Sequence, residues 1–236
     1  MRPVILIGMN FVREQRWPLF FLLLWVLGFA VFGFFVESQT SAEDALMIFK
    51  QLTFYGVVFA VFFGSSALHS DLRSHRIFAV LSKAVSRGQY LAGLLAGIGF
   101  VLGTFCVFTG LAGTWVLAQS GFNIAELWWG ILALFTASNL MAALALCLSV
   151  FLPALFAAIG SGFLAALPLV LTLRGPGLAR YFIPIYALLD PLLEADFRAS
   201  WHASVVMVAL GWLEIAALVV AATRIFSRRD VVTGGG

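Results

Sequence analysis

The sequence has little charge: Asp, Glu, Lys and Arg make up 11% of its 236 residues, whereas soluble domains typically carry about 25%. Hydrophobic residues make up 62%, and the mean hydropathy is +1.04. A soluble core cannot absorb that much apolar surface, so this composition excludes an ordinary soluble domain. It predicts one membrane domain over residues 1–236, with lipid as the solvent for much of the chain.

The residue types that build catalytic and metal centres are also scarce. The two cysteines, Cys106 and Cys147, lie in apolar runs, where a buried thiol is a better interpretation than a disulfide. The three histidines, His69, His75 and His202, lie near the ends of apolar runs and form no pair at metal-ligand spacing. There is no glycine-rich phosphate loop ending in Lys-Ser or Lys-Thr. We therefore expect no metal, cofactor or nucleic acid on this chain, and no nucleotide hydrolysis by the chain alone.

Long apolar runs are what the sequence has in abundance. A spanning helix needs about 20 apolar residues, and a segment in lipid must satisfy its own backbone hydrogen bonds, which favours helices. The sequence therefore predicts an all-α polytopic membrane protein with six transmembrane helices. They are placed at residues 18–36, 48–68, 90–118, 126–152, 153–173 and 204–226.

Two shorter segments outside these runs are also predicted to be helical. Residues 1–17 mix apolar residues with arginines and are too short to span, which favours an amphipathic elbow helix at the membrane surface, with Pro18 in the first turn of the next helix. Residues 174–201 form the longest external segment, in which Asp190 and Pro191 predict an N-cap and a first helical position. We expect a pair of short helices there, although a simple aromatic connector is an equally good interpretation.

Lysine and arginine are unevenly distributed about the six runs. The side that would hold both termini carries ten of them: Arg2, Arg13, Arg16, Arg73, Arg76, Lys83, Arg87, Arg224, Arg228 and Arg229. The other side carries the remaining four: Lys50, Arg174, Arg180 and Arg198. Because positive charge is retained on the cytoplasmic side, both termini are predicted to lie in the cytoplasm, with the chain in the cytoplasmic (inner) membrane.

A few polar side chains lie inside the apolar runs. Glu214 lies near the middle of the last run, where a charge costs about 2.5–3.5 kcal/mol on insertion scales. Asn139 and Thr104 lie at comparable depths, so a hydrogen-bonded layer could join the three helices. Glu214 either holds neighbouring helices together through hydrogen bonds or is part of a substrate or proton path. Tyr55, at the external end of the second run, is either a cavity-facing contact or an interface residue.

The third run contains small residues four apart. Gly93 and Gly97 form one such pair, and Gly99 and Gly103 form another. This spacing lets helices approach closely, and it predicts a tightly packed internal helix rather than a dedicated dimer motif.

The most polar segment between two apolar runs covers residues 69–89. It carries four cations and a single acid: Arg73, Arg76, Lys83, Arg87 and Asp71. The charges alone would serve to orient the chain in the membrane. However, Ile77, Phe78, Val80 and Leu81 lie among them at helical spacing. An apolar face of this kind favours a helix that docks on a partner.

This segment resembles the signature region of type-2 permease subunits of ATP-binding-cassette transporters. Members often read acid-x-x-x-x-[RT]-I-x-x-[VL]-L-[SA]-K-P-V-S-R-x-x-Y-L-x-G-K. The matching positions here are Asp71, Arg76, Ile77, Val80, Leu81, Ser82, Lys83, Val85, Ser86, Arg87, Tyr90, Leu91 and Gly93. Ala84 replaces the common proline and Leu94 the common lysine. The plan of the whole chain is similar too, with an elbow helix, six spans, a long loop after the second span and a basic end.

The resemblance implies a mechanical role. Two permease subunits would pair, as a homodimer or with a homologue, and two copies of a separate ATPase, which binds ATP and Mg²⁺, would dock below them. Residues 71–81 would form the coupling helix that enters a groove on the ATPase. Its polar contacts would be Asp71, Arg73 and Arg76, and its apolar contacts Ile77, Phe78 and Leu81. The short turn at residues 148–153 would give a second contact.

The sequence therefore predicts the membrane subunit of an ATP-binding-cassette exporter that works as a dimer within the lipid bilayer. One alternative is a mechanotransmitting or scaffold subunit, which couples the ATPase to external partner proteins and has no transport path. Another is a membrane enzyme acting on lipid, against which the lack of clustered His, Asp or Ser in the apolar runs argues. The sequence names no cargo.

Overall fold

The computed structural model describes residues 2–36, 42–74, 77, 85–117, 123–172, 184–194 and 205–228. Within these residues all regular secondary structure is helical, which confirms the predicted fold class for this part of the chain. The helices are α1 (Arg2–Glu14), α2 (Arg16–Val36), α3 (Ala42–Arg73), α5 (Arg87–Leu117), α6 (Ile124–Ser149), α7 (Ala154–Thr172), α8 (Ile185–Glu194) and α9 (Val205–Arg228).

Several of these helices suit a membrane. Four of them, α3, α5, α6 and α9, are long and apolar enough to cross one, and α1 with α2 gives a fifth if that bent pair counts as one span. Helix α7 adds a shorter apolar stretch, Ala154–Leu167, among the residues whose side chains are described. The described part of the chain is therefore helical, with four or five helices able to span a bilayer, each of which overlaps a predicted run.

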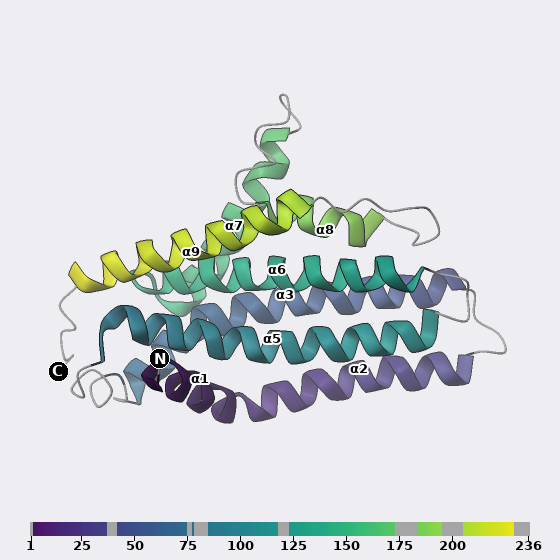
Figure 1. Ribbon diagram of the computed structural model, residues 1–236, viewed down its shortest axis with the longest axis horizontal. Helices are drawn as coiled ribbons and strands as arrows, with labels where there is room; N and C mark the ends of the chain where they lie inside the picture. Colours follow the sequence, from purple (N-terminus) through teal and green to yellow (C-terminus); the bar gives the residue numbers. More distant parts are fainter. Residues whose placement is uncertain are drawn as a thin grey trace.

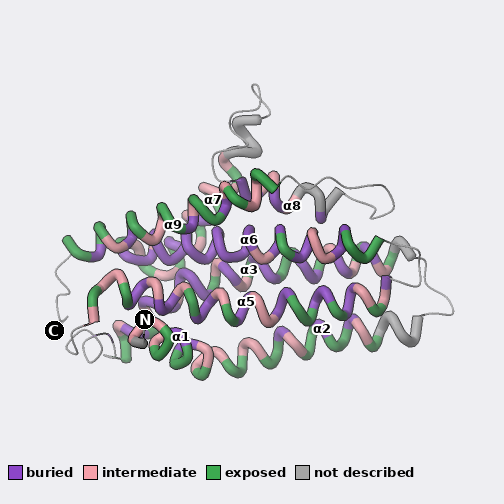
Figure 2. The backbone as a smooth tube through the Cα atoms, viewed as in Figure 1, coloured by how far each residue is buried: buried purple, intermediate pink, exposed green. Residues whose placement is uncertain are grey.

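The helices form an elongated bundle with α6 at its centre (Figure 1). Along the spanning window of α6, 83% of the residues are buried, against 17% for α9. Helices α3, α5, α7, α8 and α9 all pack on α6. Figure 2 shows the same contrast, because α6 is buried along most of its length while α2 and α9 keep an exposed side. The exposed sides are apolar, as expected of surfaces that face lipid or a partner helix.

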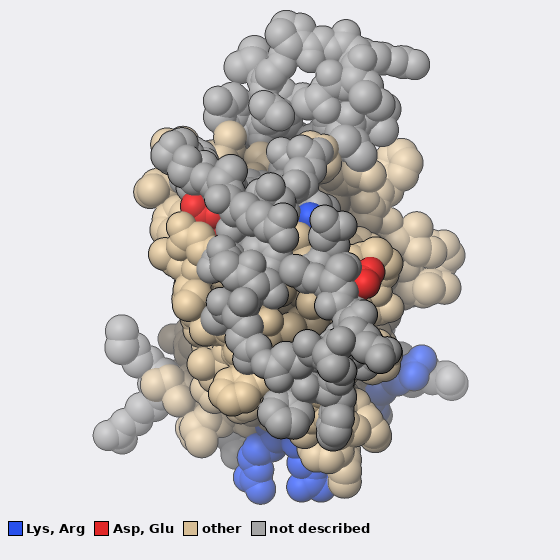
Figure 3. Space-filling model, turned by 90° about the vertical axis from the view of Figure 1, so that its right-hand side faces the viewer, with Lys and Arg blue, Asp and Glu red and all other residues tan. Residues whose placement is uncertain are grey.

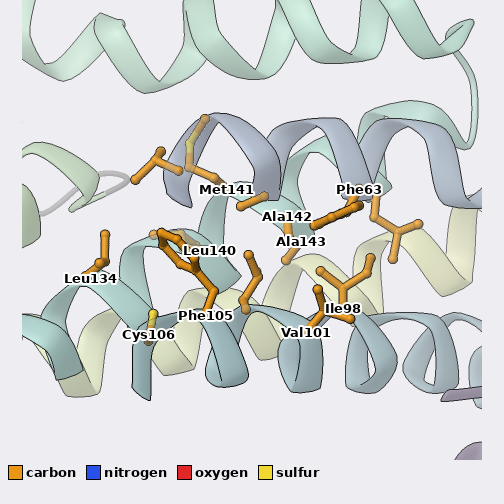
Figure 4. Packing of buried hydrophobic residues seen from close by; sticks show 14 of the residues in the cluster. Phe63, Ile98, Val101, Phe105, Cys106, Leu134, Leu140, Met141, Ala142 and Ala143 are labelled. Carbon is orange, nitrogen blue, oxygen red and sulfur yellow. The ribbon is translucent and has the colours of Figure 1, made fainter. Parts of the chain in front are cut away.

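The core lies where α3, α5 and α6 meet (Figure 4). Phe63 of α3 and Phe105 of α5 are 0% and 1% exposed and pack beside a run of small residues on α6. Gly64 brings α3 against the backbone of Ala142, since a Cβ at Gly64 would overlap the Ala142 carbonyl oxygen. Close approach through small residues is the main way in which helices pack in lipid.

The elbow between α1 and α2 follows from a proline. The two helices meet at a bend of 63°, with Gln15 between them. Pro18 lies in the first turn of α2, as predicted, and has no N–H to donate to the carbonyl of Glu14. Backbone hydrogen bonds continue on both sides of the gap, from Gln15 to Phe11 and from Leu19 to Gln15. The chain therefore kinks without losing its helical path.

The glycines at the start of α5 pack against α1. A Cβ at Gly97 would lie 2.9 Å from the carbonyl oxygen of Gly8, and a Cβ at Gly93 would lie 2.8 Å from Cβ of Ile7. The predicted close packing of this helix is confirmed, and its partner is the elbow helix. On the outward side of α1, Ile5 and Leu6 are 59% and 65% exposed. Helix α1 thus has one face against α5 and an apolar face open to a membrane.

One predicted helix boundary is wrong. Asp190 and Pro191 were expected to open a helix, but both lie inside α8, which begins at Ile185 after Pro184. The helix packs on α6, α7 and α9, and Ile185, Leu188 and Leu192 are buried. Burial of this apolar face stabilises a longer helix than the N-cap at Asp190 would allow, so the helix begins at Ile185 and not at Pro191. Only one helix of the expected pair falls among the described residues of the segment 174–201.

The two ends of the bundle differ in charge. The end that holds α1, the end of α3 and the end of α9 carries five exposed arginines: Arg13, Arg16, Arg73, Arg224 and Arg228. Figure 3 looks onto the opposite end, where acidic side chains show in red and the larger basic groups project at the lower and right-hand margins. This arrangement agrees with the uneven charge seen in the sequence.

Candidate functional site

The polar segment between α3 and α5 is flanked by three helix ends. Helix α3 finishes at Arg73, α5 begins at Arg87, and α9 finishes at Arg228 at the same end of the bundle (Figure 1). Ser74 closes α3 by donating its hydroxyl to the carbonyl of Ser70 at 2.9 Å. The positions that carry the family resemblance therefore lie around one junction of helices.

Asp71 and Tyr90 connect α3 to α5 inside this junction. The Tyr90 hydroxyl donates a hydrogen bond to Oδ2 of Asp71. Tyr90 is 0% exposed and Asp71 is 9% exposed, so the bond is shielded from solvent. A hydrogen bond to a charged group is typically worth about 1.5–3 kcal/mol, which makes this pair a strong link between the two flanks of the segment. Asp71 was predicted to contact a partner, but its side chain here points into the chain itself.

Helix α5 begins with a reciprocal capping box. The backbone N–H of Gln89 donates to the Ser86 hydroxyl at 3.2 Å, and the backbone N–H of Ser86 donates to the Gln89 side chain at 3.2 Å. The pattern Ser-x-x-Gln is the sequence signal for this motif, so the capping box could have been predicted from the sequence alone. The box fixes the point at which the polar segment ends and α5 begins.

Arg87 reaches from the first turn of α5 to the end of α9. Its Nη1 donates to the carbonyl oxygens of Phe226 at 2.5 Å and Ser227 at 3.2 Å. Its guanidinium carbon lies 5.4 Å from the centre of the Phe226 ring, a cation–π distance. The same ring lies 6.5 Å from that of Tyr90. Phe226, which is 4% exposed, was not among the residues singled out from the sequence, because its partners come from another helix.

The residues expected to meet an ATPase have different positions. Arg73 is exposed at the end of α3, as a contact residue should be. Ile77 is 0% exposed and belongs to the main hydrophobic core, so in this conformation its side chain packs inside the chain instead of facing a partner. Arg76, Phe78 and Leu81 lie outside the described residues.

The turn expected to give a second contact connects α6 to α7. It closes through hydrogen bonds from Phe151 and Leu152 to the carbonyl of Leu148, at 3.1 and 2.9 Å. Phe151 is 44% exposed. Two large apolar side chains of the following turn, Leu155 and Phe156, are 67% and 59% exposed. The turn therefore presents an apolar surface.

The polar residues inside the helices bond mostly to their own backbone. Asn139 donates its amide to the carbonyl of Phe135 at 2.8 Å, and Thr104 donates its hydroxyl to the carbonyl of Phe100 at 2.9 Å. The Asn139 side chain also fills the space beside Gly99, whose Cβ would lie 2.9 Å from the Asn139 oxygen. Glu214 is half-buried on α9. Asn139 and Thr104 are thus satisfied locally instead of through a shared layer.

Tyr55 lines an apolar groove between α2 and α3. The groove has a volume of about 460 Å³, and its walls come from Phe21, Leu22, Trp25, Tyr55, Val58 and Phe59. A neighbouring groove of about 530 Å³ shares Phe21 and Trp25 and extends to Gly28 and Ile48. The Tyr55 and Trp25 rings meet edge to face at 6.0 Å. Tyr55 is 42% exposed, so it faces this groove and not a closed cavity.

In the described part of the chain, no group of three or more His, Cys, Asp or Glu side chains could hold a metal ion. No protein-family model matches the chain, and no curated protein matches it. The junction of α3, α5 and α9, with the exposed surface around it, is therefore the candidate functional site.

Proposed function

We propose that this chain is the membrane-spanning subunit of an ATP-binding-cassette transporter that exports a substrate across the cytoplasmic membrane. In this proposal α2, α3, α5, α6, α7 and α9 are the six spans, and both termini lie in the cytoplasm. Two such subunits, identical or homologous, pair in the bilayer. Two copies of a separate ATPase bind ATP and Mg²⁺ and supply the work.

The observation that carries the proposal is the junction around the polar segment. Asp71, Arg87 and Tyr90 occupy signature positions of the resemblance, and all three take part in contacts that fix the flanks of residues 75–84. A segment that receives force from a soluble partner needs firmly held flanks, because loose ones would absorb the movement. Exposed Arg73 at its edge suits a specific contact, since surface charge governs association and partner choice more than raw affinity.

The junction also supports the alternative of a mechanotransmitting subunit. Helix α9 is fixed to the polar segment at one end, and near its other end Gly211 approaches Leu188 of α8, at 3.4 Å from a Cβ built on the glycine. A displacement of α9 would therefore reach the external face directly. Export and mechanotransmission share the ATPase and the docking segment, so a first experiment addresses both.

The experiment is affinity purification of the detergent-solubilised chain from its native membrane, with wild type compared with Phe78→Asp. We expect an ATPase at a one-to-one ratio with the wild-type chain and its loss from the variant, because a carboxylate in an apolar docking face cannot be desolvated cheaply. Phe151→Asp, at the exposed α6–α7 turn, measures the second contact, and the circular dichroism of each purified variant, compared with that of the wild type, controls for misfolding. Retention of the ATPase by Phe78→Asp would place docking elsewhere.

A further inference from the structure

Helix α9 is weakly held along most of its length. Its buried residues are Gly211, Ile215, Ala222 and Phe226, so Phe226 is the one large aromatic among them. Most of the other apolar residues on the helix face outward, such as Val206 and Leu213 at 64% and 66% exposed. The contacts of Phe226 therefore have a large share in fixing the cytoplasmic end of this helix.

Arg87 is electrostatically misplaced for its own helix. It is the first residue of α5, and a helix N-terminus carries partial positive charge that disfavours a cation. The same guanidinium lies at the C-terminus of α9, where the last carbonyls have no helical partners and where a cation is favoured. The position of Arg87 is thus explained by α9 and not by α5.

The backbone between Arg87 and Tyr90 is shaped for the same contact. A Cβ at Gly88 would lie 3.0 Å from Cγ2 of Thr223, tighter than ordinary van der Waals contact. Glycine at this position lets the first turn of α5 approach α9 closely enough for Arg87 to reach the Phe226 carbonyl. Tyr90, three residues further on, then contacts the Phe226 ring on one side and Asp71 on the other.

We propose that Asp71, Arg87, Tyr90 and Phe226 form a clamp, here named the α9 clamp, that holds the end of α9 to both flanks of the polar segment. Arg87 is its principal positioning residue. Through the clamp, α9 follows the end of α3 and the start of α5 as a rigid extension, so that motion imposed on these two flanks moves α9 with them. The source of that motion rests on the proposed function, whereas the clamp itself does not.

The clamp is tested first in the chain alone, by the reactivity of a buried thiol. Ala222 is 2% exposed and lies one turn before Phe226, so Ala222→Cys reports opening of the α9 end. The native cysteines are replaced by alanine in the background. We expect Arg87→Gln to raise the rate of N-ethylmaleimide labelling about tenfold, which corresponds to ~1.4 kcal/mol. Arg87→Lys keeps the cation near the α9 carbonyls and should restore part of the protection.

Arg224→Gln is the matched control, because it removes the same charge from the same end of α9 while Arg224 is exposed and outside the clamp. Labelling should stay within twofold of the parent. Equal labelling of the Arg87→Gln variant and its parent would overturn the clamp. An equal effect of Arg224→Gln would also overturn it, because the change in labelling would then come from net charge and not from the contacts of Arg87.

The rigid coupling is tested by a covalent link. A Cβ at Gly88 would lie 3.9 Å from Cβ of Thr223, within the range of about 3.5–4.5 Å found in disulfides. Gly88→Cys with Thr223→Cys should therefore form a bond on mild oxidation, and the oxidised chain should keep its ATP hydrolysis with the ATPase within twofold. A tenfold loss that a reductant reverses would mean that the clamp opens during the cycle. If no ATPase binds, the proposed function fails and the labelling experiment still decides the clamp.

Discussion

The close approach of α3 to α6 gives a quantitative test of the packing. A Cβ at Gly64 would overlap the carbonyl oxygen of Ala142 and lie 3.0 Å from the Ala142 Cα. Because the obstacle is backbone, it cannot turn away as a side-chain tip could. Overpacking of a core costs about 1–3 kcal/mol, and alanine gains about 1 kcal/mol over glycine in a helix. Gly64→Ala should therefore destabilise the protein by up to about 2 kcal/mol.

Gly162 on α7 is the matched control, since it is also a helical glycine in an apolar sequence but a Cβ there would meet no atom within 4 Å beyond the backbone of its own helix. There only the helix propensity acts, and Gly162→Ala should stabilise the chain by about 0.5–1 kcal/mol. The assay is SDS-induced unfolding of the chain in mixed micelles, followed by circular dichroism. Equal unfolding free energies for the two variants would refute the packing of α3 on α6.

Three further predictions follow from local geometry. Tyr90→Phe should cost about 2 kcal/mol in SDS unfolding, because it leaves the Asp71 carboxylate buried without its donor, and combination with Asp71→Asn should be less than additive. Pro18→Ala restores a donor to the α1–α2 junction and should reduce the 63° bend, which spin labels on the two helices would detect as a longer separation. Asn123→Ala removes the N-cap of α6, whose side chain accepts from Ala125 at 3.0 Å, and should cost about 1 kcal/mol, whereas Asn123→Asp should retain the cap. A thermal unfolding series in detergent measures the last pair, and equal stability of the two would contradict the cap.

The sequence predicted what depends on periodicity and composition. Each apolar run became a helix, and Pro18 marked the elbow. The four-residue spacing of Gly93 and Gly97 indicated a close helix approach, which the structure confirms. These features are local or depend on one helix at a time, so a single sequence is enough to read them.

The sequence could not predict which partners meet across helices. Gly93 and Gly97 face α1, and this partner is determined by the packing of the whole bundle and not by the local sequence. Asp71 and Ile77 lie on the polar segment and its flank, where charge and apolar spacing favoured an outward role, yet both side chains are turned inward. Arg87 and Phe226 are far apart in the chain, and no local pattern connects them.

The Asn139 and Thr104 side chains do not depend on a shared polar layer. Asn139 and Thr104 can each donate to a carbonyl four residues earlier in their own helix, which satisfies the donor without a second helix. Depth in the membrane therefore does not by itself bring polar residues together. The N-cap predicted at Asp190 was wrong because burial of the apolar face of α8 decides where that helix begins.

The proposed function is tested most directly by the mass of the complex that contains this chain. The chain has a mass of 25.6 kDa, and native mass spectrometry of the complex captured from its own membrane resolves the number of copies and the identity of each partner. We expect two membrane subunits with two copies of a nucleotide-binding ATPase. The ATPase should dissociate when Arg73 is changed to glutamate but not when Arg16 is. A chain that is isolated alone, or with partners that bind no nucleotide, would contradict it.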